Sequence, residues 1–233
     1  MPDAFSRTRR RGSIRGLVSA FLALVTACSS TGGDSPDGAE SAADTLSIAH
    51  EASRDLTGDG VLERITVVAR GPAYDSMDVR LAISGRGQVL HAAEWSTGLY
   101  FFYEDRALLA DSVVETRVRE HLADLVTDGL SESGPPVQWW SERERTREMR
   151  ASIRHSVAES MWRESHRVPV SEPLPREAYA GIAALQPPEA RVDSLVKELR
   201  DKPVYSYYAG GEANYYIAWS DREQQFHVVY SCC

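Results

Sequence analysis

A nine-residue stretch carries the oxygen-bearing side chains best suited to hold a metal ion. It runs from Asp55 to Glu63 as Asp-Leu-Thr-Gly-Asp-Gly-Val-Leu-Glu. A hard cation such as Ca²⁺ prefers oxygen ligands arranged around a sharply bent loop. The stretch offers side-chain oxygens at positions 1, 3, 5 and 9, a backbone carbonyl at position 7 and a glycine at position 6 for the bend. The chemistry expected here is calcium binding that stiffens a loop, with no catalytic role.

This stretch resembles the D-x-[DNT]-G-D-G-x-x-[DE] loops of secreted bacterial proteins of the VCBS and FG-GAP type. The resemblance implies five ligands, which are Asp55, Thr57, Asp59, the Val61 carbonyl and Glu63. Those families use tandem copies and this chain has a single one, which disfavours a propeller or an adhesin. Because three carboxylates lie beside Arg54 and Arg64, we expect weak affinity, with a dissociation constant of roughly 10⁻⁴ to 10⁻³ M. The alternative is a tight turn held by side-chain to backbone hydrogen bonds without metal.

The first 28 residues have the pattern of an export signal that ends in a lipid-attachment cysteine. Arginines precede an apolar run that ends at Ala27 and is shorter than the roughly 20 residues that span a bilayer. The sequence Val-Thr-Ala-Cys at this point resembles the lipobox of bacterial lipoproteins. The resemblance implies cleavage before Cys28 and palmitate-type acyl chains on it that anchor the protein. Ser29 stands where an inner-membrane retention signal has Asp, which favours the outer membrane where the host has one.

Two adjacent cysteines, Cys232 and Cys233, close the sequence. If Cys28 is acylated, these two have only each other as partners within the chain, in an oxidising compartment. Four interpretations stay open: a strained vicinal disulfide, a cross-link to another protein, thiols near His227 that take a soft metal, or two small residues that end a strand.

Sequence motifs of catalysis are lacking. There is no G-x-S-x-G, no P-loop, no G-x-G-x-x-G and no CxxC, and His155 with Glu159 lacks the second histidine of a metalloprotease helix. No nucleophile and base can be paired from the sequence. The chain is therefore expected to be a structural or binding module, with an envelope hydrolase as the alternative.

Two clusters of side chains have both a functional and a structural interpretation. Four arginines between Arg143 and Arg154 share one helical stripe, which suits an anion groove or, as we prefer, a face paired with acids. Six tyrosines crowd the last 30 residues. Their rings suit stacking on sugar or peptide or, as we prefer, covering a sheet.

Charge and composition separate a tether from a folded part. The 233 residues carry 34 acidic and 26 basic side chains, and removing residues 1–27 leaves 33 against 21, a net charge of −12. Such an acidic protein is not expected to bind nucleic acid. Residues 29–45 lack large apolar side chains and are expected to form, with the lipidated cysteine, a flexible segment over 28–45.

The elements that must position these residues follow from hydrophobic periodicity. Alternation predicts strands in two groups, 65–69, 77–83 and 88–95, then 204–208, 215–219 and 226–230. Capping-box spacings begin two central helices at Ser112 and Ser141, and a shorter helix is predicted over 191–200. The pattern favours a single α+β domain over 46–233. In it, N- and C-terminal meanders build an antiparallel sheet, and the central helices pack on one face.

The sequence thus predicts a lipid-anchored protein of the bacterial cell envelope, with its domain in the periplasm or at the cell surface. Its expected partners are the membrane, through Cys28, and an envelope protein or glycan. A redox or metal-handling lipoprotein that uses Cys232 and Cys233 is a further alternative.

Overall fold

The computed structural model describes residues 45–101, 106–131, 141–211 and 213–232. These residues fall within one compact unit, Ser41–Cys233. The predicted signal peptide, the lipid attachment at Cys28, most of the tether and Cys233 lie outside the described residues. No described helix is long and apolar enough to cross a membrane.

The N-terminal half forms an antiparallel sheet of four strands in sequential order. The strands are β1 (Leu46–Arg54), β2 (Glu63–Gly71), β3 (Asp78–Gly85) and β4 (Gln88–Ser96). Alternation drives this sheet, since Ile65, Val67 and Ala69 point into the core and are fully buried. The three predicted strands are confirmed. Strand β1 was not predicted, because Ile48 is its only buried residue.

The C-terminal half forms a second sheet in the order β5-β6-β7-β8. Its strands are β5 (Leu130–Ser131), β6 (Val204–Tyr208), β7 (Asn214–Ser220) and β8 (Gln225–Cys232). The pairing register shifts where Tyr216 faces Tyr230 and Ile217 faces Val228, so Val229 is the extra residue of a bulge. All three strands predicted here are confirmed.

Four helices lie between and beside these strands. They are α1 (Asp111–Thr127), α2 (Glu142–His166), α3 (Ala178–Ala184) and α4 (Glu189–Leu199). The capping box of Ser141 and Glu144 starts α2 as predicted. The one predicted at Ser112 is wrong, because α1 already begins at Asp111 and Glu115 binds Tyr74 and Arg119 instead.

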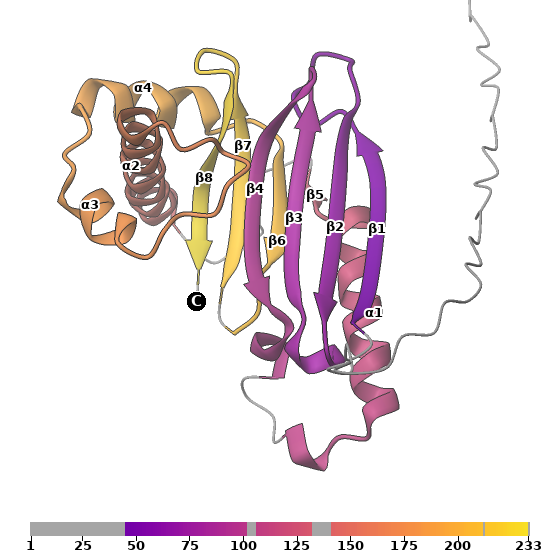
Figure 1. Ribbon diagram of the computed structural model, residues 1–233. Coiled ribbons are helices and arrows are strands. Elements are labelled where there is room, and N and C mark those ends of the chain that lie inside the picture. The colour runs from indigo at the N-terminus through magenta and orange to yellow at the C-terminus, as the bar shows by residue number, and fades with distance from the viewer. Residues whose placement is uncertain (1–44, 102–105, 132–140, 212, 233) are drawn as a thin grey trace, which may run out of the picture. The chain divides into compact units, whose positions relative to one another are not determined.

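The second sheet is covered on both of its faces (Figure 1). Tyr205 and Ile217 point toward the first sheet and α1, whereas Val204 and Ala218 pack against α2 and α4. The α+β class is confirmed. The structure adds that the two meanders form two sheets instead of one, and that α1 lies on the opposite side of the second sheet from α2 and α4.

Candidate functional site

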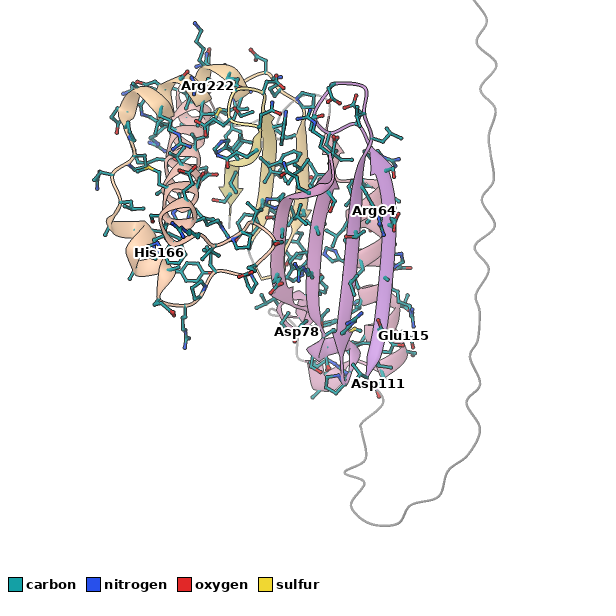
Figure 2. The ribbon with its side chains drawn as sticks, turned by 45° about the horizontal axis from the view of Figure 1, so that its top comes forward. Arg64, Asp78, Asp111, Glu115, His166 and Arg222 are labelled. Atoms are coloured by element: carbon teal, nitrogen blue, oxygen red, sulfur yellow. The ribbon has the colours of Figure 1, made fainter. Side chains whose placement is uncertain are left out.

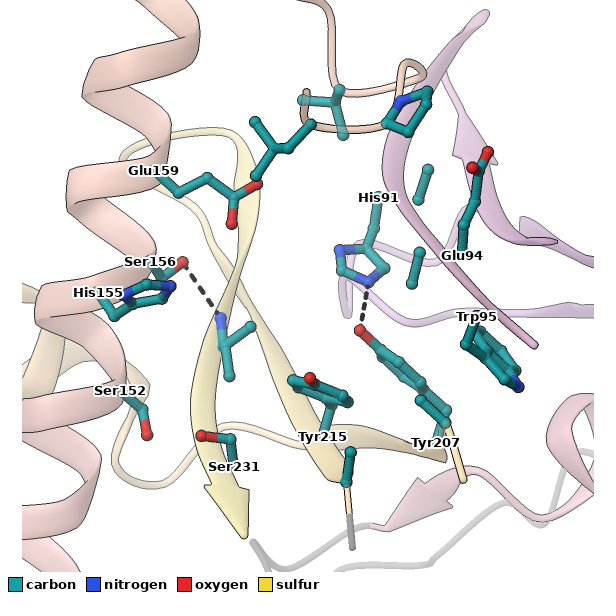
Figure 3. A pocket seen from close by; sticks show the side chains of 18 of the residues that line it. His91, Glu94, Trp95, Ser152, His155, Ser156, Glu159, Tyr207, Tyr215 and Ser231 are labelled. Carbon is teal, nitrogen blue, oxygen red and sulfur yellow. Dashed lines mark hydrogen bonds between the residues drawn. The ribbon is translucent and has the colours of Figure 1, made fainter. Parts of the chain in front are cut away.

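A groove of about 710 Å³ lies where the first sheet stops covering the second. Strand β4 forms one wall and α2 the other, and part of the second sheet forms the floor. Figure 3 shows Glu94 and Trp95 on the β4 side and His155 and Glu159 on the α2 side. The segment Val170–Leu174, which follows α2, lines the groove as well.

The α2 wall is one polar stripe of the helix. Its groove-lining residues recur every three or four positions, as Ser152, His155, Ser156, Glu159, Ser160 and Arg163. The neighbouring stripe, with Met149, Ile153 and Val157, is buried against α4 and the second sheet. Helix α2 is therefore anchored by its apolar side and presents hydroxyl, imidazole and carboxylate groups to the groove.

The floor is aromatic. Tyr207 stacks on Trp95 at 6.0 Å and on Tyr215 at 5.2 Å between ring centroids. The His91 Nε2 atom lies 3.1 Å from the Tyr207 hydroxyl. Burial, together with the nearby charge of Arg163, lowers the pKa of His91 to about 4, so the imidazole is neutral at pH 7.

The charge in the groove is mainly negative. Its lining includes the carboxylates of Glu94, Glu148, Glu159 and Glu172 and the guanidinium of Arg163. Arg163 pairs with Glu159 at 2.8 Å and donates to the carbonyls of Pro169 and Glu172 at 2.9 and 3.0 Å. The Arg163 side chain is only 12% exposed and ties α2 to the next segment, whereas Glu94 and Glu148 form exposed pairs with Arg80 and Arg147 at 3.6 and 3.0 Å.

Beneath the α2 wall, a serine, a histidine and a glutamate form a chain of polar contacts. His227 Nδ1 lies 3.2 Å from the Ser156 hydroxyl, and His227 Nε2 lies 3.2 Å from Glu223 Oε2. Arg191 holds that carboxylate with two hydrogen bonds of 2.8 and 2.7 Å. This group was not predictable from local sequence patterns, since its members come from α2, α4 and the β7–β8 hairpin.

The turn of that hairpin contacts α4 and the segment that follows α4. Arg222, seen at the hairpin in Figure 2, donates its backbone N–H to Glu198 at 3.4 Å and its guanidinium to Ser194. Lys202 pairs with Asp221 at 2.5 Å.

In the predicted calcium loop, the aspartates accept hydrogen bonds from the loop's own backbone. Asp55 accepts from Gly58 and Gly60 at 2.7 and 2.9 Å, and both glycines have the positive φ that such a turn requires. Asp59 accepts from Val61 at 2.8 Å and pairs with Arg86 at 2.5 Å. The hydrogen bond from Arg86 and that from Val61 lower the pKa of Asp59.

Glu63 closes the loop from inside the protein. It is completely buried, and its carboxylate accepts the Leu56 and Thr57 backbone N–H groups at 2.8 and 3.3 Å and the Thr57 hydroxyl at 3.3 Å. Among the residues that the structure describes, no three His, Cys, Asp or Glu side chains form a group that could hold a metal ion. These hydrogen bonds are those of the turn alternative, and calcium binding stays a prediction.

A calcium titration followed by thermal unfolding separates the two interpretations. A site with a dissociation constant of about 10⁻³ M gains about 1.4 kcal/mol at about 10 mM calcium, which raises Tm by roughly 3–6 °C. The variant Asp55→Asn should lose this rise, because it removes a ligand carboxylate. An unchanged Tm in the wild type would assign the loop to the hydrogen-bonded turn.

The remaining sequence predictions fall on paired or covered side chains. Arg150 and Arg154 pair with Glu189 of α4 at 2.7 Å, as the preferred interpretation of the arginine stripe requires. Tyr205 and Tyr207 are buried between the sheets, so these rings cover a sheet. The Cys232 side chain and Cys233 lie outside the described residues, and their redox or metal role stays a prediction.

Sequence reasoning considered the tyrosine cluster that includes Tyr207, but it did not select His91 or Ser156, which line the same groove. These residues belong to three different elements. His91 lies 65 positions before Ser156 and 116 positions before Tyr207. One signal was available in the sequence, namely serines spaced by four along α2 at 152, 156 and 160. Comparison with known protein families, with curated proteins and with solved structures finds no match to this chain, so the groove is interpreted from its own geometry.

Proposed function

We propose that this chain is a lipid-anchored protein of the bacterial envelope whose folded domain binds a ligand in the groove between β4 and α2. The observation that carries the binding role is the groove itself. Its volume of about 710 Å³ falls in the range of about 300–1,000 Å³ typical of ligand sites. Its aromatic floor and its polar wall supply the two kinds of contact that such sites combine.

The anchor supports the envelope location. The lipobox-like segment places acyl chains on Cys28, and the polar segment that follows lets the domain reach a ligand away from the bilayer. The acidic domain is repelled by anionic lipid, which favours binding above the membrane surface over binding on it. In this proposal calcium, where bound at Asp55–Glu63, stiffens the loop and takes no part in ligand binding.

Membrane fractionation tests the anchor. The wild-type protein is expected in the membrane fraction, and Cys28→Ala is expected to be released or retained in precursor form without acylation, because no thiol remains to carry the lipid. The matched control Cys232→Ala should stay in the membrane fraction. Acylation that persists in Cys28→Ala, or membrane anchoring of a Cys28→Ala protein from which the signal peptide has been cleaved, would refute the lipoprotein assignment.

A second candidate function is an ester or amide hydrolase. The contacts from Ser156 through His227 to Glu223 favour it, because a serine, a base and a carboxylate in series can activate a nucleophile. Two features oppose it. The Ser156 hydroxyl accepts the Val228 backbone N–H at 3.3 Å, and the N–H after Ser156 belongs to the interior of α2, where the helix uses it.

A fluorophosphonate probe decides between these functions. A hydrolase should become labelled in the wild type and in Ser160→Ala, and should lose the label in Ser156→Ala and His227→Gln. We expect no label at Ser156, because its hydroxyl serves to fasten β8 to α2. Stoichiometric labelling at Ser156 would establish the hydrolase.

A further inference from the structure

We infer that the groove takes an extended, basic peptide segment that pairs with β4 as an added strand. The inference names the ligand class of the groove and so rests on the proposed binding function. It depends on the way in which β4 meets the cavity, on the hydrogen bonding of β4 and on the charge of the lining.

Strand β4 presents its edge to the groove. The five consecutive residues His91, Ala92, Ala93, Glu94 and Trp95 all line the cavity. Side chains alternate between the two faces of a sheet, so a face would contribute only every second residue. A run of five therefore means that the backbone edge itself borders the cavity, and the two alanines leave that edge open to an approaching chain.

That edge has free hydrogen-bonding capacity. Strand β4 is the last strand of its sheet and pairs with β3 alone. Within the described part of the chain, no backbone group of 91–95 has a hydrogen-bond partner outside β3. An open edge is the template on which strand addition occurs, and proteins usually cover it. Here the groove walls shield it from other sheets while leaving room for one chain.

Across the groove, one backbone donor of the neighbouring edge is already taken by α2. Strand β8 is the last strand of the second sheet, and its Val228 N–H donates to the Ser156 hydroxyl of α2. A peptide in the groove therefore finds its main-chain partners on β4 and its side-chain partners on α2. Five residues of strand extend over roughly 17 Å, so a peptide of five to seven residues matches the edge.

The lining selects for positive charge. Four carboxylates border the groove, and three of them have an arginine partner, since Glu159 pairs with Arg163, Glu94 with Arg80 at 3.6 Å and Glu148 with Arg147 at 3.0 Å. The last two pairs are exposed and therefore weak, so a basic side chain of a ligand can compete for these carboxylates. Neutral His91 adds no positive charge at pH 7. Lysine or arginine side chains of a bound strand would reach Glu94 on one side and Glu148 on the other, and the exposed ring of Tyr179 lies at the same groove.

Four synthetic heptapeptides, capped at both ends, test the inference on the full-length protein in detergent. The first alternates lysine and valine, and the second alternates glutamate and valine. The third and fourth have the sequence of the first with N-methyl groups on every second amide. These two differ in phase, that is, in which of the two alternating sets of amides is methylated. We expect the basic peptide to bind at least tenfold more tightly than the acidic one. N-methylation should weaken binding at least tenfold in one phase and much less in the other, because only alternate amides face β4.

Paired variants locate the site. Ser152→Trp fills the groove from α2 and should abolish peptide binding, whereas Ser112→Trp on the exposed start of α1 should not. Glu94→Gln with Glu148→Gln should weaken the basic peptide several-fold. The control Glu51→Gln with Glu120→Gln makes the same change in net charge outside the groove and should leave binding unchanged.

The outcomes separate this inference from the proposed function. Equal loss in both N-methyl phases, or equal binding of the basic and acidic peptides, would overturn strand addition. Binding of a chitin-type oligosaccharide that Ser152→Trp abolishes, with no peptide binding, would overturn the peptide inference and keep the groove as a ligand site. Binding of peptides that Ser152→Trp leaves unchanged would overturn both.

Discussion

Replacing Glu63 with alanine is expected to destabilise the folded domain by about 3–5 kcal/mol. The change leaves three buried donors of Leu56 and Thr57 without their acceptor. Each buried donor left unsatisfied costs about 1–3 kcal/mol, and the space vacated by a completely buried side chain adds to this. Thermal unfolding should show a fall in Tm on the order of 10 °C.

Two further variants make the cause visible. Glu63→Gln keeps one acceptor oxygen and should lose only about half as much stability as Glu63→Ala. Glu51→Ala removes a glutamate from the same sheet whose side chain is 52% exposed and pairs with Arg64, and it should cost about 0–1 kcal/mol. If Glu63→Ala were no more harmful than Glu51→Ala, the carboxylate would not be what holds the loop closed.

This loop shows how far sequence spacing reaches. The pattern of Asp55, Gly58 and Gly60 correctly predicts a tight turn entering a strand, because glycine supplies the positive φ and aspartate accepts backbone N–H groups. The same oxygens serve a metal or the amides equally well. The burial of Glu63 depends on β3 and β4, which the local pattern does not contain.

The elements were predictable wherever one periodicity dominates. The alternation at 65–69 and the apolar stripe of α4 each follow from burial of one face. The division into two sheets was not predictable. Alternation indicates that one face of a strand is buried, but it does not identify the element that covers that face. The second sheet is covered on both faces, by the first sheet and by α2 with α4, and only the fold shows this.

The groove was the least predictable feature. It exists because the first sheet ends at β4, beside Tyr207, before covering Tyr215, and because α2 stands off from that edge. No local sequence signal marks where a sheet stops. The contact between His227 and Glu223 is equally hidden, since a spacing of four residues is a helix signal and here joins a hairpin to a strand.

Replacing Glu223 with alanine is expected to cost about 3 kcal/mol. Its carboxylate accepts two hydrogen bonds from Arg191 and one contact from His227, which is only 1% exposed. Removing one partner of a largely buried charged group leaves the others unpaired, which is the costly case. Urea unfolding at pH 7 measures the loss. Glu189→Ala is the matched control, because Glu189 also binds two arginines but is exposed, and it should change stability little.

The stabilisation by Glu223 should also depend on pH in a defined direction. Burial alone would raise the pKa of Glu223, but the hydrogen bonds from Arg191 and His227 lower it by more, so the folded-state pKa lies below the ordinary value of about 4.5. The folded protein then binds this proton less tightly than the unfolded chain. The stabilisation is therefore complete above about pH 4.5 and is lost as the pH falls further, by about 1.4 kcal/mol per pH unit.

The difference in stability between the wild type and Glu223→Gln should accordingly be constant from pH 7 to pH 5 and shrink toward pH 3. A difference that stays the same at pH 3 would mean that Glu223 acts through packing, and that its charge does not hold the hairpin to α4.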